Sequence, residues 1–515
     1  MTVQTRPDHM EADLLIVGGG INGACIARDA AGRGLKVVLC EQADLAQATS
    51  SSSSKLIHGG LRYLEMYEFR LVREALAERE VLLKAAPHII WPLRFVLPHN
   101  KLLRPRWMIR LGLFLYDHIG GRRSLPGTKS LDLTSSLQGQ PLKPALTRGF
   151  EYSDCWVEDS RLVVLNAKDA EQRGAEIFVR TRCIDARRED GHWVATLSDQ
   201  VTGTQRSVKA RVLVNAAGPW VDRFLRHGLG RNEEAHLKLV KGSHIIVPKL
   251  YEGAHAYILQ NTDKRVIFTI PYERNFTLIG TTDLVYQGDP AEVAISDEEV
   301  TYLCEAVSAY FENGPSPDQI VRTYAGVRPL YDDHSENPSA VTRDYVFDVE
   351  APEGGAALLS IYGGKITTSR KLAEHAMEKL KPYLSDLKPT WTAGQTLPGG
   401  DIANADFDAF LANLKSQYSF LPDGLAWRYA RLYGTLSDHI LNGKTSLEDL
   451  GGMLGADLYE AEAQYLIKHE WAQTADDVLW RRTKLGLVMS QEEIQRVETW
   501  FENRSNAAPV TAEAV

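Results

Sequence analysis

Apolar and polar positions near the start of the chain follow the pattern of a strand, a helix and a second strand. Residues 14–17 form a continuous apolar run, which predicts a strand buried on both faces. After a glycine-rich turn, small apolar positions predict a helix that ends at the glycines of 32–34. The next strand is predicted at 36–40, where four apolar residues follow Lys36. This succession is typical of a doubly wound, parallel sheet.

Later stretches predict the remaining elements. A buried strand at 211–215 runs into a turn of small residues and is expected to return to the first sheet. The stretch 358–380 predicts a strand, a glycine turn and a helix over 367–380. Two stretches, 240–248 and 256–283, are rich in β-branched and aromatic side chains, with turn signals between them, and predict antiparallel strands of a second domain. Beyond a linker at 389–400, the spacing of Leu, Trp and Tyr is helical.

The turn after the first strand carries a complete dinucleotide-binding fingerprint. Gly18 permits the sharp turn, Gly20 leaves room for a pyrophosphate at the helix N-terminus, and Gly23 lets the helix lie close to the sheet. Glu41 ends the second strand about 20 residues further on, where its carboxylate can accept hydrogen bonds from a ribose. The fingerprint predicts a nucleotide cofactor but does not distinguish NAD from FAD.

Length, composition and charge narrow the class of protein. A chain of 515 residues with 44% hydrophobic and 24% charged residues is globular and has more than one core. Its five cysteines are scattered, so we expect buried thiols in a reducing compartment and no metal site. We find neither a secretory signal nor an apolar run of about 18 to 20 residues that could span a membrane. The formal charge of −9 is concentrated after residue 400, and the absence of a large basic face argues against nucleic-acid binding.

One segment departs from this acidic balance. Residues 94–123 contain seven Lys or Arg and a single acid, and Arg106 and Arg110 share one face of a predicted helix. The same helix carries an apolar stripe at Trp107, Met108, Leu111, Phe114 and Leu115. This combination is typical of an interfacial helix on anionic lipid, and the alternative is a helix whose stripe packs on the core.

Five motifs in a fixed order extend beyond the fingerprint, at residues 53–65, 241–244, 280–283, 326–330 and 363–365. In this order they resemble the FAD-dependent, aerobic glycerol-3-phosphate dehydrogenases over nearly the whole chain. The resemblance implies oxidation of sn-glycerol 3-phosphate to dihydroxyacetone phosphate, with electrons passed to a membrane quinone. It also implies an α/β fold in which a Rossmann-like FAD-binding domain is interleaved with an antiparallel α+β substrate domain, followed by an all-helical C-terminal domain.

We expect these domains to divide the chain into discontinuous parts. The FAD-binding domain is expected at 10–85, 150–235 and 340–388, the substrate domain at 86–149 and 236–339, and the C-terminal domain at 389–515. The serine-rich loop 49–54 is expected to be tightly bound, with hydroxyls that reach phosphate or flavin oxygens. The expected cofactor-binding residues are Gly18, Gly20, Ile21, Asn22, Gly23, Glu41, Thr49, Ser50, Ser54, Lys55, Leu56, His58, Gly60, Ala217, Gly218, Gly364, Lys365, Ile366 and Thr367.

Oxidation of a secondary alcohol requires a proton acceptor, a flavin and cations for the substrate phosphate. Arginine matches phosphate oxygens with a planar fork, so the resemblance assigns Arg328 and Arg343 to the phosphate and the reacting oxygen. His58 and His244 are the candidate bases, with His58 preferred for its closeness to the flavin loop, and a structural role is the alternative for each. Arg328 could instead polarise the substrate oxygen. The expected substrate-binding residues are Arg62, Tyr63, His244, Thr281, Arg328, Arg343 and Lys365, and Thr281, Thr282 and Asp283 are expected to orient the catalytic groups.

A quinone acceptor requires contact with the bilayer, which favours the membrane interpretation of 94–123. We therefore expect a cytoplasmic protein, attached peripherally to the inner face of the cell membrane, and a homodimer. The rival enzymes are a glycerol-3-phosphate oxidase that uses O₂ and, more distantly, an amino-acid oxidase. If the protein is not an enzyme, the alternative is a flavin-binding redox sensor whose C-terminal domain recruits a partner.

Overall fold

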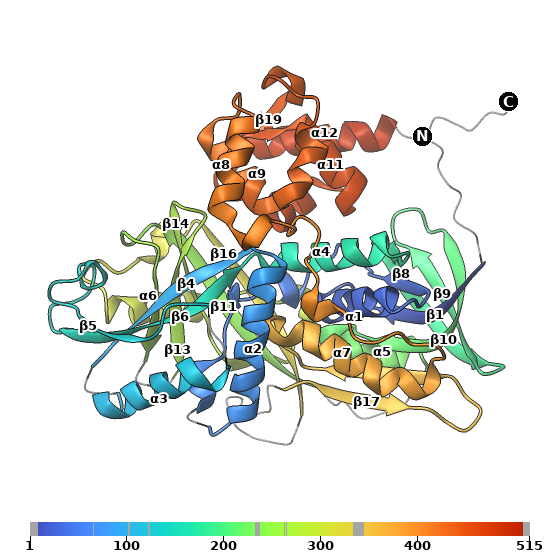
Figure 1. The fold of residues 1–515 in the computed structure, drawn as a ribbon. Helices are drawn as coiled ribbons and strands as arrows, with labels where there is room; N and C mark the ends of the chain where they lie inside the picture. The colour runs from blue at the N-terminus through green and yellow to red at the C-terminus, as the bar shows by residue number, and fades with distance from the viewer. Residues whose placement is uncertain are drawn as a thin grey trace.

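The computed structural model describes residues 9–64, 66–100, 103–121, 124–231, 237–261, 263, 265–332 and 344–507. Two large sheets stand side by side, and the C-terminal helices form a separate layer at one end of the molecule (Figure 1). Helix α3 (Arg106–Ile119) lies at the opposite end from those helices (Figure 1).

The first sheet is the doubly wound one that the N-terminal pattern predicts. Its strands are β1 (His9–Val17), β2 (Val37–Cys40), β7 (Glu176–Phe178), β8 (Thr181–Glu189), β9 (His192–Asp199), β10 (Gln205–Asn215), β17 (Val346–Glu350) and β18 (Ala357–Tyr362). Strands β18, β10, β1, β2 and β7 are parallel neighbours, with β10 between β1 and β18. The strand expected at 211–215 therefore returns to this sheet.

Burial on both faces explains the continuous apolar run of β1. Leu14 and Ile16 belong to the core under helices α1 (Ile21–Gly32), α4 (Asp159–Gln172) and α7 (Ser369–Leu380). Leu15 and Val17 belong to the core on the opposite face, with residues of the β8–β9 hairpin and of α5 (Val221–His227). Successive side chains of a strand point to opposite faces, so each face needs its own apolar residues.

The second sheet is almost entirely antiparallel. Its strands are β3 (Leu56–Ile57), β4 (Ile90–Pro98), β5 (Lys129–Asp132), β6 (Arg148–Val157), β11 (Leu237–Pro248), β12 (Ala256–Gln260), β13 (Val266–Tyr272), β14 (Phe276–Gly280), β15 (Leu284–Val285) and β16 (Arg322–Tyr331). Helix α6 (Asp297–Ser308) shares a core with one face, and α2 (Phe69–Ala85) and α3 share a core with the other. The strands expected within 240–283 are confirmed as β11 to β14.

Strand β6 departs from the expected domain boundary at 149/150. All of β6 pairs in the second sheet, next to β4, from Ile90↔Val157 to Pro98↔Gly149. The chain crosses to the first sheet only after Val157, where α4 begins at Asp159. Strand β6 stays in the second sheet because it pairs continuously with β4 from Gly149 to Val157.

The C-terminal region is helical, as expected, apart from a short ribbon. Its elements are α8 (Phe407–Gln417), α9 (Asp423–Tyr433), α10 (Asp438–Leu441), α11 (Glu460–Glu470), a π-helix (Asp477–Arg482), α12 (Gln491–Ala507) and the two strands β19 (Met453–Gly455) and β20 (Leu458–Tyr459). Its core is continuous with residues of the N-terminal part, including Ile57 and Leu162. The region is thus packed onto the two sheets rather than tethered to them.

Candidate active site

The first glycine turn is shaped by contacts that exclude any side chain. Gly18 has φ +114°, and a Cβ there would lie 2.4 Å from the carbonyl oxygen of Ala216. A Cβ on Gly23 would lie 1.9 Å from the carbonyl oxygen of Gly18, so glycine at both positions brings α1 close to the sheet. The N-cap of α1 is Gly20, and the amino end of this helix opens onto a cavity.

Glu41 supports this turn from the end of β2. Its carboxylate accepts hydrogen bonds from the backbone N–H of Gly19 at 2.7 Å and of Ala43 at 2.8 Å. Burial raises the pKa of Glu41. A carboxylate has about four lone-pair sites, so these bonds leave room for a hydroxyl donor such as that of a ribose.

The serine-rich loop joins the nucleotide turn to the second sheet. Ser50 Oγ accepts a hydrogen bond from the backbone N–H of Ile21 at 3.0 Å, and Thr49 Oγ1 donates to the carbonyl oxygen of Val327 at 2.7 Å. A Cβ on Gly326 would lie 2.7 Å from Cβ of Ser52, so the loop lies directly on β16. The loop is therefore held between the two sheets, as expected from its sequence context.

A second glycine turn meets the first. Asn22 Nδ2 donates to the carbonyl oxygen of Gly363 at 3.1 Å, while the buried Oδ1 of Asn22 has no hydrogen-bond partner within the described part of the chain. Gly363 and Gly364 have φ of +75° and +99°, a conformation that favours glycine. This turn leads into α7, and the two helix starts thus face one region.

A cavity of about 510 Å³ extends between these elements. Among the expected cofactor residues, those that line it are Gly18, Gly20, Ile21, Asn22, Glu41, Thr49, Ser50, Ala217, Gly218 and Gly364. The lining residues that sequence reasoning missed include Thr181, Arg182, Cys183, Ile184, Trp220, Arg223, Phe224, Ala325, Gly326 and Val327. Trp220 to Phe224 continue the small-residue turn after β10 and could have been found from it, whereas 181–184 carry no motif.

The other expected cofactor residues do not line this cavity: Gly23, Ser54, Lys55, Leu56, His58, Gly60, Lys365, Ile366 and Thr367. Lys55 has a different role from the expected one. Its buried ammonium donates to the carboxylate of Asp159 at 2.8 and 2.9 Å and to the carbonyl oxygen of Ser51 at 2.9 Å. Lys55 therefore anchors the serine-rich loop to the first residue of α4. Leu56 is in β3 and packs in a core.

His244 lies in β11 and is buried against the serine-rich loop. Its side chain is buried, its Nε2 lies 2.9 Å from Ser54 Oγ, and its ring stacks on Tyr324 with 4.7 Å between centroids. Burial holds the pKa of His244 well below its usual value, and the positive charges of Lys55 and Arg328 act in the same direction. The imidazole is therefore neutral at physiological pH.

Arg328 lies on the same face of the second sheet as His244. In the pairing of β11 with β16, His244 is opposite Tyr324 and Val240 is opposite Arg328, and alternate residues share a face. The guanidinium of Arg328 is paired with Asp283 and donates to Thr281 Oγ1 at 3.0 Å. Thr281 and Asp283 thus orient Arg328, as expected, and Thr282 Oγ1 accepts from the backbone N–H of Ser243 at 3.1 Å.

His58 and its neighbours lie against the start of α7. The backbone N–H of His58 donates to Thr367 Oγ1 at 3.3 Å, and the His58 ring meets Phe268 edge-on at 6.2 Å. The ammonium of Lys365 lies 3.9 Å from the centroid of the Tyr63 ring. Arg343 and the side chain of Arg62 lie outside the described residues.

The apolar stripe of α3 faces outward instead of packing on the core. Trp107, Leu111, Phe114 and Leu115 have exposed fractions of 67%, 51%, 52% and 41%. The side chains of α3 that are buried are Leu113 and Tyr116. The structure therefore contradicts the core-packing alternative for this stripe.

The part of the chain that the structure describes offers neither a membrane-spanning helix nor a cluster of metal ligands. No helix there is long and apolar enough to cross a membrane. No group of three or more His, Cys, Asp or Glu side chains there is arranged to hold a metal ion. All five cysteines are buried and free, as expected.

Comparisons with known proteins agree with this architecture. Residues 13–370 match the family model described as FAD dependent oxidoreductase, and residues 390–503 match the C-terminal domain of alpha-glycerophosphate oxidase. The glycerol-3-phosphate dehydrogenase of Pseudomonas aeruginosa is 56% identical over 96% of this chain and 96% of its own. The D-erythritol 1-phosphate dehydrogenase of Brucella abortus is 54% identical over 96% of this chain and 99% of its own.

A solved structure extends the comparison to three dimensions. The glycerol-3-phosphate dehydrogenase of Bacillus halodurans, determined in complex with FAD, superposes with a TM-score of 0.73 at 27% identity, covering 98% of this chain and 96% of that one. The family model and these relatives span both sheets and the C-terminal region. The chain therefore belongs to the FAD-dependent oxidoreductases, in the family that includes the glycerol-3-phosphate dehydrogenases.

Proposed function

We propose that this enzyme oxidises sn-glycerol 3-phosphate to dihydroxyacetone phosphate and that its electrons pass to a membrane quinone. The observation that carries the proposal is the shared face of Arg328 and His244 on the second sheet, where Asp283 and Thr281 hold the Arg328 guanidinium. Val327 and Pro329, on the other face of the same strand, line the cavity. A fixed guanidinium near a buried histidine, on a strand that borders a nucleotide cavity, suits a small phosphorylated substrate.

The residues present fit FAD. The cradle formed by Gly18 and Gly20 admits a pyrophosphate against the amino end of α1, and the unpartnered Asn22 Oδ1 is an acceptor for a cofactor donor. Glu41 has lone pairs free for ribose hydroxyls. When bound, FAD supplies the two-electron acceptor for the alcohol carbon. We assign the other residues that line the cavity, including Ser50 and Gly364, to contacts with the rest of the FAD molecule.

On the substrate side, the role of the protein is to fix the phosphate and to take up the hydroxyl proton. We assign Arg328 and Arg343 to the phosphate and the reacting oxygen, and we assign Arg62, Tyr63 and Lys365 to further contacts with the substrate. Contact between the Lys365 ammonium and the Tyr63 ring supports a joint role for those two residues.

The proton acceptor is one of two histidines. We assign this role to His58, because its side chain is only partly buried and its backbone N–H is held by Thr367, just before α7. His244 is fully enclosed, and its low pKa makes it the weaker base. We assign His244 to positioning Ser54 and the loop that carries it.

The substrate assignment has one specific rival, D-erythritol 1-phosphate, because the Brucella abortus relative matches this chain as well as the glycerol-3-phosphate dehydrogenase of Pseudomonas aeruginosa does. Both compounds present a secondary alcohol and a phosphate, but erythritol phosphate has one more CHOH unit and hence a second secondary alcohol. Steady-state kinetics with each compound, using a soluble quinone as acceptor, would distinguish them. A kcat/KM at least about tenfold higher for sn-glycerol 3-phosphate is expected, a difference within the range that pocket contacts provide.

We further propose that α3 docks this enzyme on the cytoplasmic face of an anionic membrane. The 3₁₀ helix Leu61–Leu64 contacts α3, and the turn that follows it exposes Met66 and Tyr67, by 41% and 79%. This turn therefore adds to the apolar surface of α3, and Arg106 and Arg110 are exposed on the same helix. An apolar face combined with arginines is the composition of an interfacial helix.

The acceptor and the oligomeric state are predictions with direct tests. Rapid formation of peroxide in air without added quinone would favour the oxidase alternative. Light scattering of the purified enzyme tests the expected homodimer.

A further inference from the structure

The loop that follows β2 has two functional faces. One face lines the cavity with Glu41, Ala43, Gln47 and Ala48. From the same loop the side chain of Asp44 points the other way, toward the C-terminal region, and it is completely buried. The loop therefore connects the cavity with a region that lies more than four hundred positions later in the sequence.

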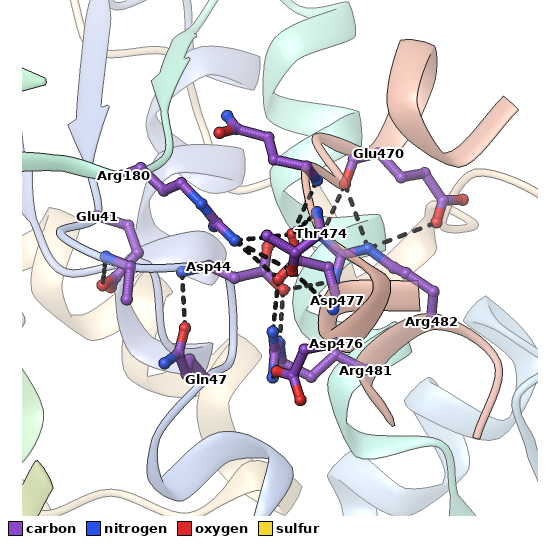
Figure 2. A network of polar contacts seen from close by, with 12 residues as sticks. Glu41, Asp44, Gln47, Arg180, Glu470, Thr474, Asp476, Asp477, Arg481 and Arg482 are labelled. Atoms are coloured by element: carbon purple, nitrogen blue, oxygen red, sulfur yellow. Dashed lines mark hydrogen bonds and ion pairs between the residues drawn. The ribbon is translucent and has the colours of Figure 1, made fainter. Parts of the chain in front are cut away.

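Two successive arginines of the C-terminal π-helix hold Asp44 (Figure 2). Arg481 Nε donates to Asp44 Oδ2 at 2.6 Å, and Arg482 donates to both carboxylate oxygens at 2.8 Å. Arg482 is also completely buried and donates to the carbonyl oxygen of Glu470 at 2.7 Å. A π-helix is a rare backbone form that occurs frequently at functional sites.

A second connection runs parallel to the first through Arg180. The backbone N–H of Arg180 donates to the carbonyl oxygen of Ala43 at 2.8 Å, and its guanidinium donates to the carboxylate of Asp477 at 2.9 and 3.0 Å. The next residue, Thr181, donates its backbone N–H to the carbonyl oxygen of Glu41 at 2.7 Å. Both connections end at the loop that carries Glu41.

The network is balanced in charge, and its centre is closed to solvent. Arg180, Arg481 and Arg482 face the carboxylates of Asp44, Asp476 and Asp477. Asp44 and Asp477 are completely buried, whereas Asp476 lies at the surface. Loss of one member leaves an uncompensated charge inside the protein, which disfavours the docked arrangement. The position of the loop therefore depends on the docked C-terminal region, and the docking depends on the loop.

We propose that the C-terminal region positions the cofactor loop: Arg481 and Arg482 hold Asp44, and through it they place Glu41 for the ribose of FAD. The inference rests on the proposed ribose contact of Glu41. Asp44, Arg481 and Arg482 are positioning residues, because none of them lines the cavity. Linkage requires reciprocity, so docking strengthens FAD binding by the same factor by which FAD strengthens docking.

The first test compares matched variants of the full chain. Arg482→Met removes the ion pair with Asp44, and Glu462→Gln removes a buried ion pair with Arg428 that lies wholly within the C-terminal region. After reconstitution of the apoprotein, we expect Arg482→Met to raise the dissociation constant of FAD about tenfold, within the usual range of coupling between sites, and Glu462→Gln to change it less than about twofold. Equal weakening in both variants would overturn the inference, because it would reflect general destabilisation.

The second test needs no variant. Hydrogen exchange of the wild-type chain is measured with and without FAD. We expect the amides of the π-helix to exchange about tenfold faster without FAD, while those of α8 stay unchanged. If FAD binds but the exchange rates of the π-helix amides stay the same, the proposed coupling is overturned while the cofactor assignment stands. If the wild-type chain binds no FAD, both the cofactor assignment and the coupling are overturned.

Discussion

The hydroxyl of Tyr116 accepts a hydrogen bond from the backbone N–H of Gly59 at 2.8 Å. Tyr116 lies on the inner side of α3, whose outer side exposes the apolar stripe, and Gly59 directly follows the candidate base His58. The same hydroxyl donates to the carboxylate of Asp154 at 2.8 Å, which Arg79 also holds at 2.9 Å. The helix proposed to meet the membrane is therefore bonded directly to the loop that carries the candidate base.

Tyr116→Phe should loosen this loop. The change leaves the buried Gly59 N–H without its acceptor, and an unsatisfied buried donor costs about 1 to 3 kcal/mol. We expect a lower melting temperature and a lower kcat, with FAD content unchanged. Differential scanning calorimetry and turnover measurements check this, and wild-type values for both would contradict the proposed link.

Arg328→Lys should fail to preserve activity although it preserves charge. Lysine cannot reproduce the planar fork that faces Asp283 and Thr281, so kcat/KM should fall about 100-fold, while FAD content stays at the wild-type level. Stopped-flow reduction of the flavin by substrate measures the effect on the reductive half-reaction. Full activity with lysine would remove Arg328 from the substrate site.

Stability should depend on pH through His88. Burial lowers the pKa of His88 to about 3, helped by the charges of Arg161 and Arg431, and neither ring nitrogen has a hydrogen-bond partner among the described residues. The folded-state pKa lies below the unfolded one, so stability is fully present above the usual value of about 6.5 and is lost as pH falls through the interval toward 3.

His88→Leu should remove this dependence. Between about pH 7.5 and about pH 5, the wild type should lose about 2 kcal/mol more than the variant, as 1.5 pKa units imply. Urea unfolding at the two pH values gives the comparison. Parallel losses in both proteins would show that His88 does not titrate on unfolding.

Membrane docking should require the outer side of α3. Replacing Trp107, Leu111 and Phe114 by serine removes apolar contacts worth about 1.5 to 3 kcal/mol each when fully buried, so sedimentation with anionic vesicles should be abolished. Val201→Ser is the control, because Val201 is 69% exposed on the β9–β10 connection, away from α3.

Charge reversal tests the electrostatic part of the docking separately. Arg104, Arg106 and Arg110 are exposed at the start of α3 or within it, and their change to glutamate should weaken binding to anionic vesicles and remove its dependence on salt. Vesicle binding and quinone-coupled activity that both survive the reversal would exclude this face as the docking surface.

The parts of the site that the sequence predicted are those whose function depends on neighbours along the chain. Gly18, Gly20 and Gly23 are fixed by the steric demands of one turn, and Glu41 by the spacing of the strand that follows. Backbone sterics of this kind are visible in a short window of sequence. The parallel pairing of the first two strands followed for the same reason.

The features that the sequence did not reveal depend on contacts between distant segments. Lys55 was expected at the cofactor, but its ammonium is bound by Asp159, which lies 104 positions away in the sequence. The orientation of α3 was open because Leu113 and Tyr116 are as apolar as the stripe, so periodicity alone could not select the buried side. The position of β6 in the second sheet is set by its pairing with β4, and no local sequence pattern predicts that pairing.

The most direct test of the account is the visible spectrum of the purified, FAD-loaded enzyme under anaerobic conditions, recorded before and after addition of sn-glycerol 3-phosphate. The account predicts that the absorbance band of the oxidised flavin bleaches upon addition of the substrate, because two electrons move from the alcohol carbon to the cofactor. A flavin band that stays unchanged with sn-glycerol 3-phosphate, but bleaches with D-erythritol 1-phosphate or with neither compound, would contradict the proposed substrate.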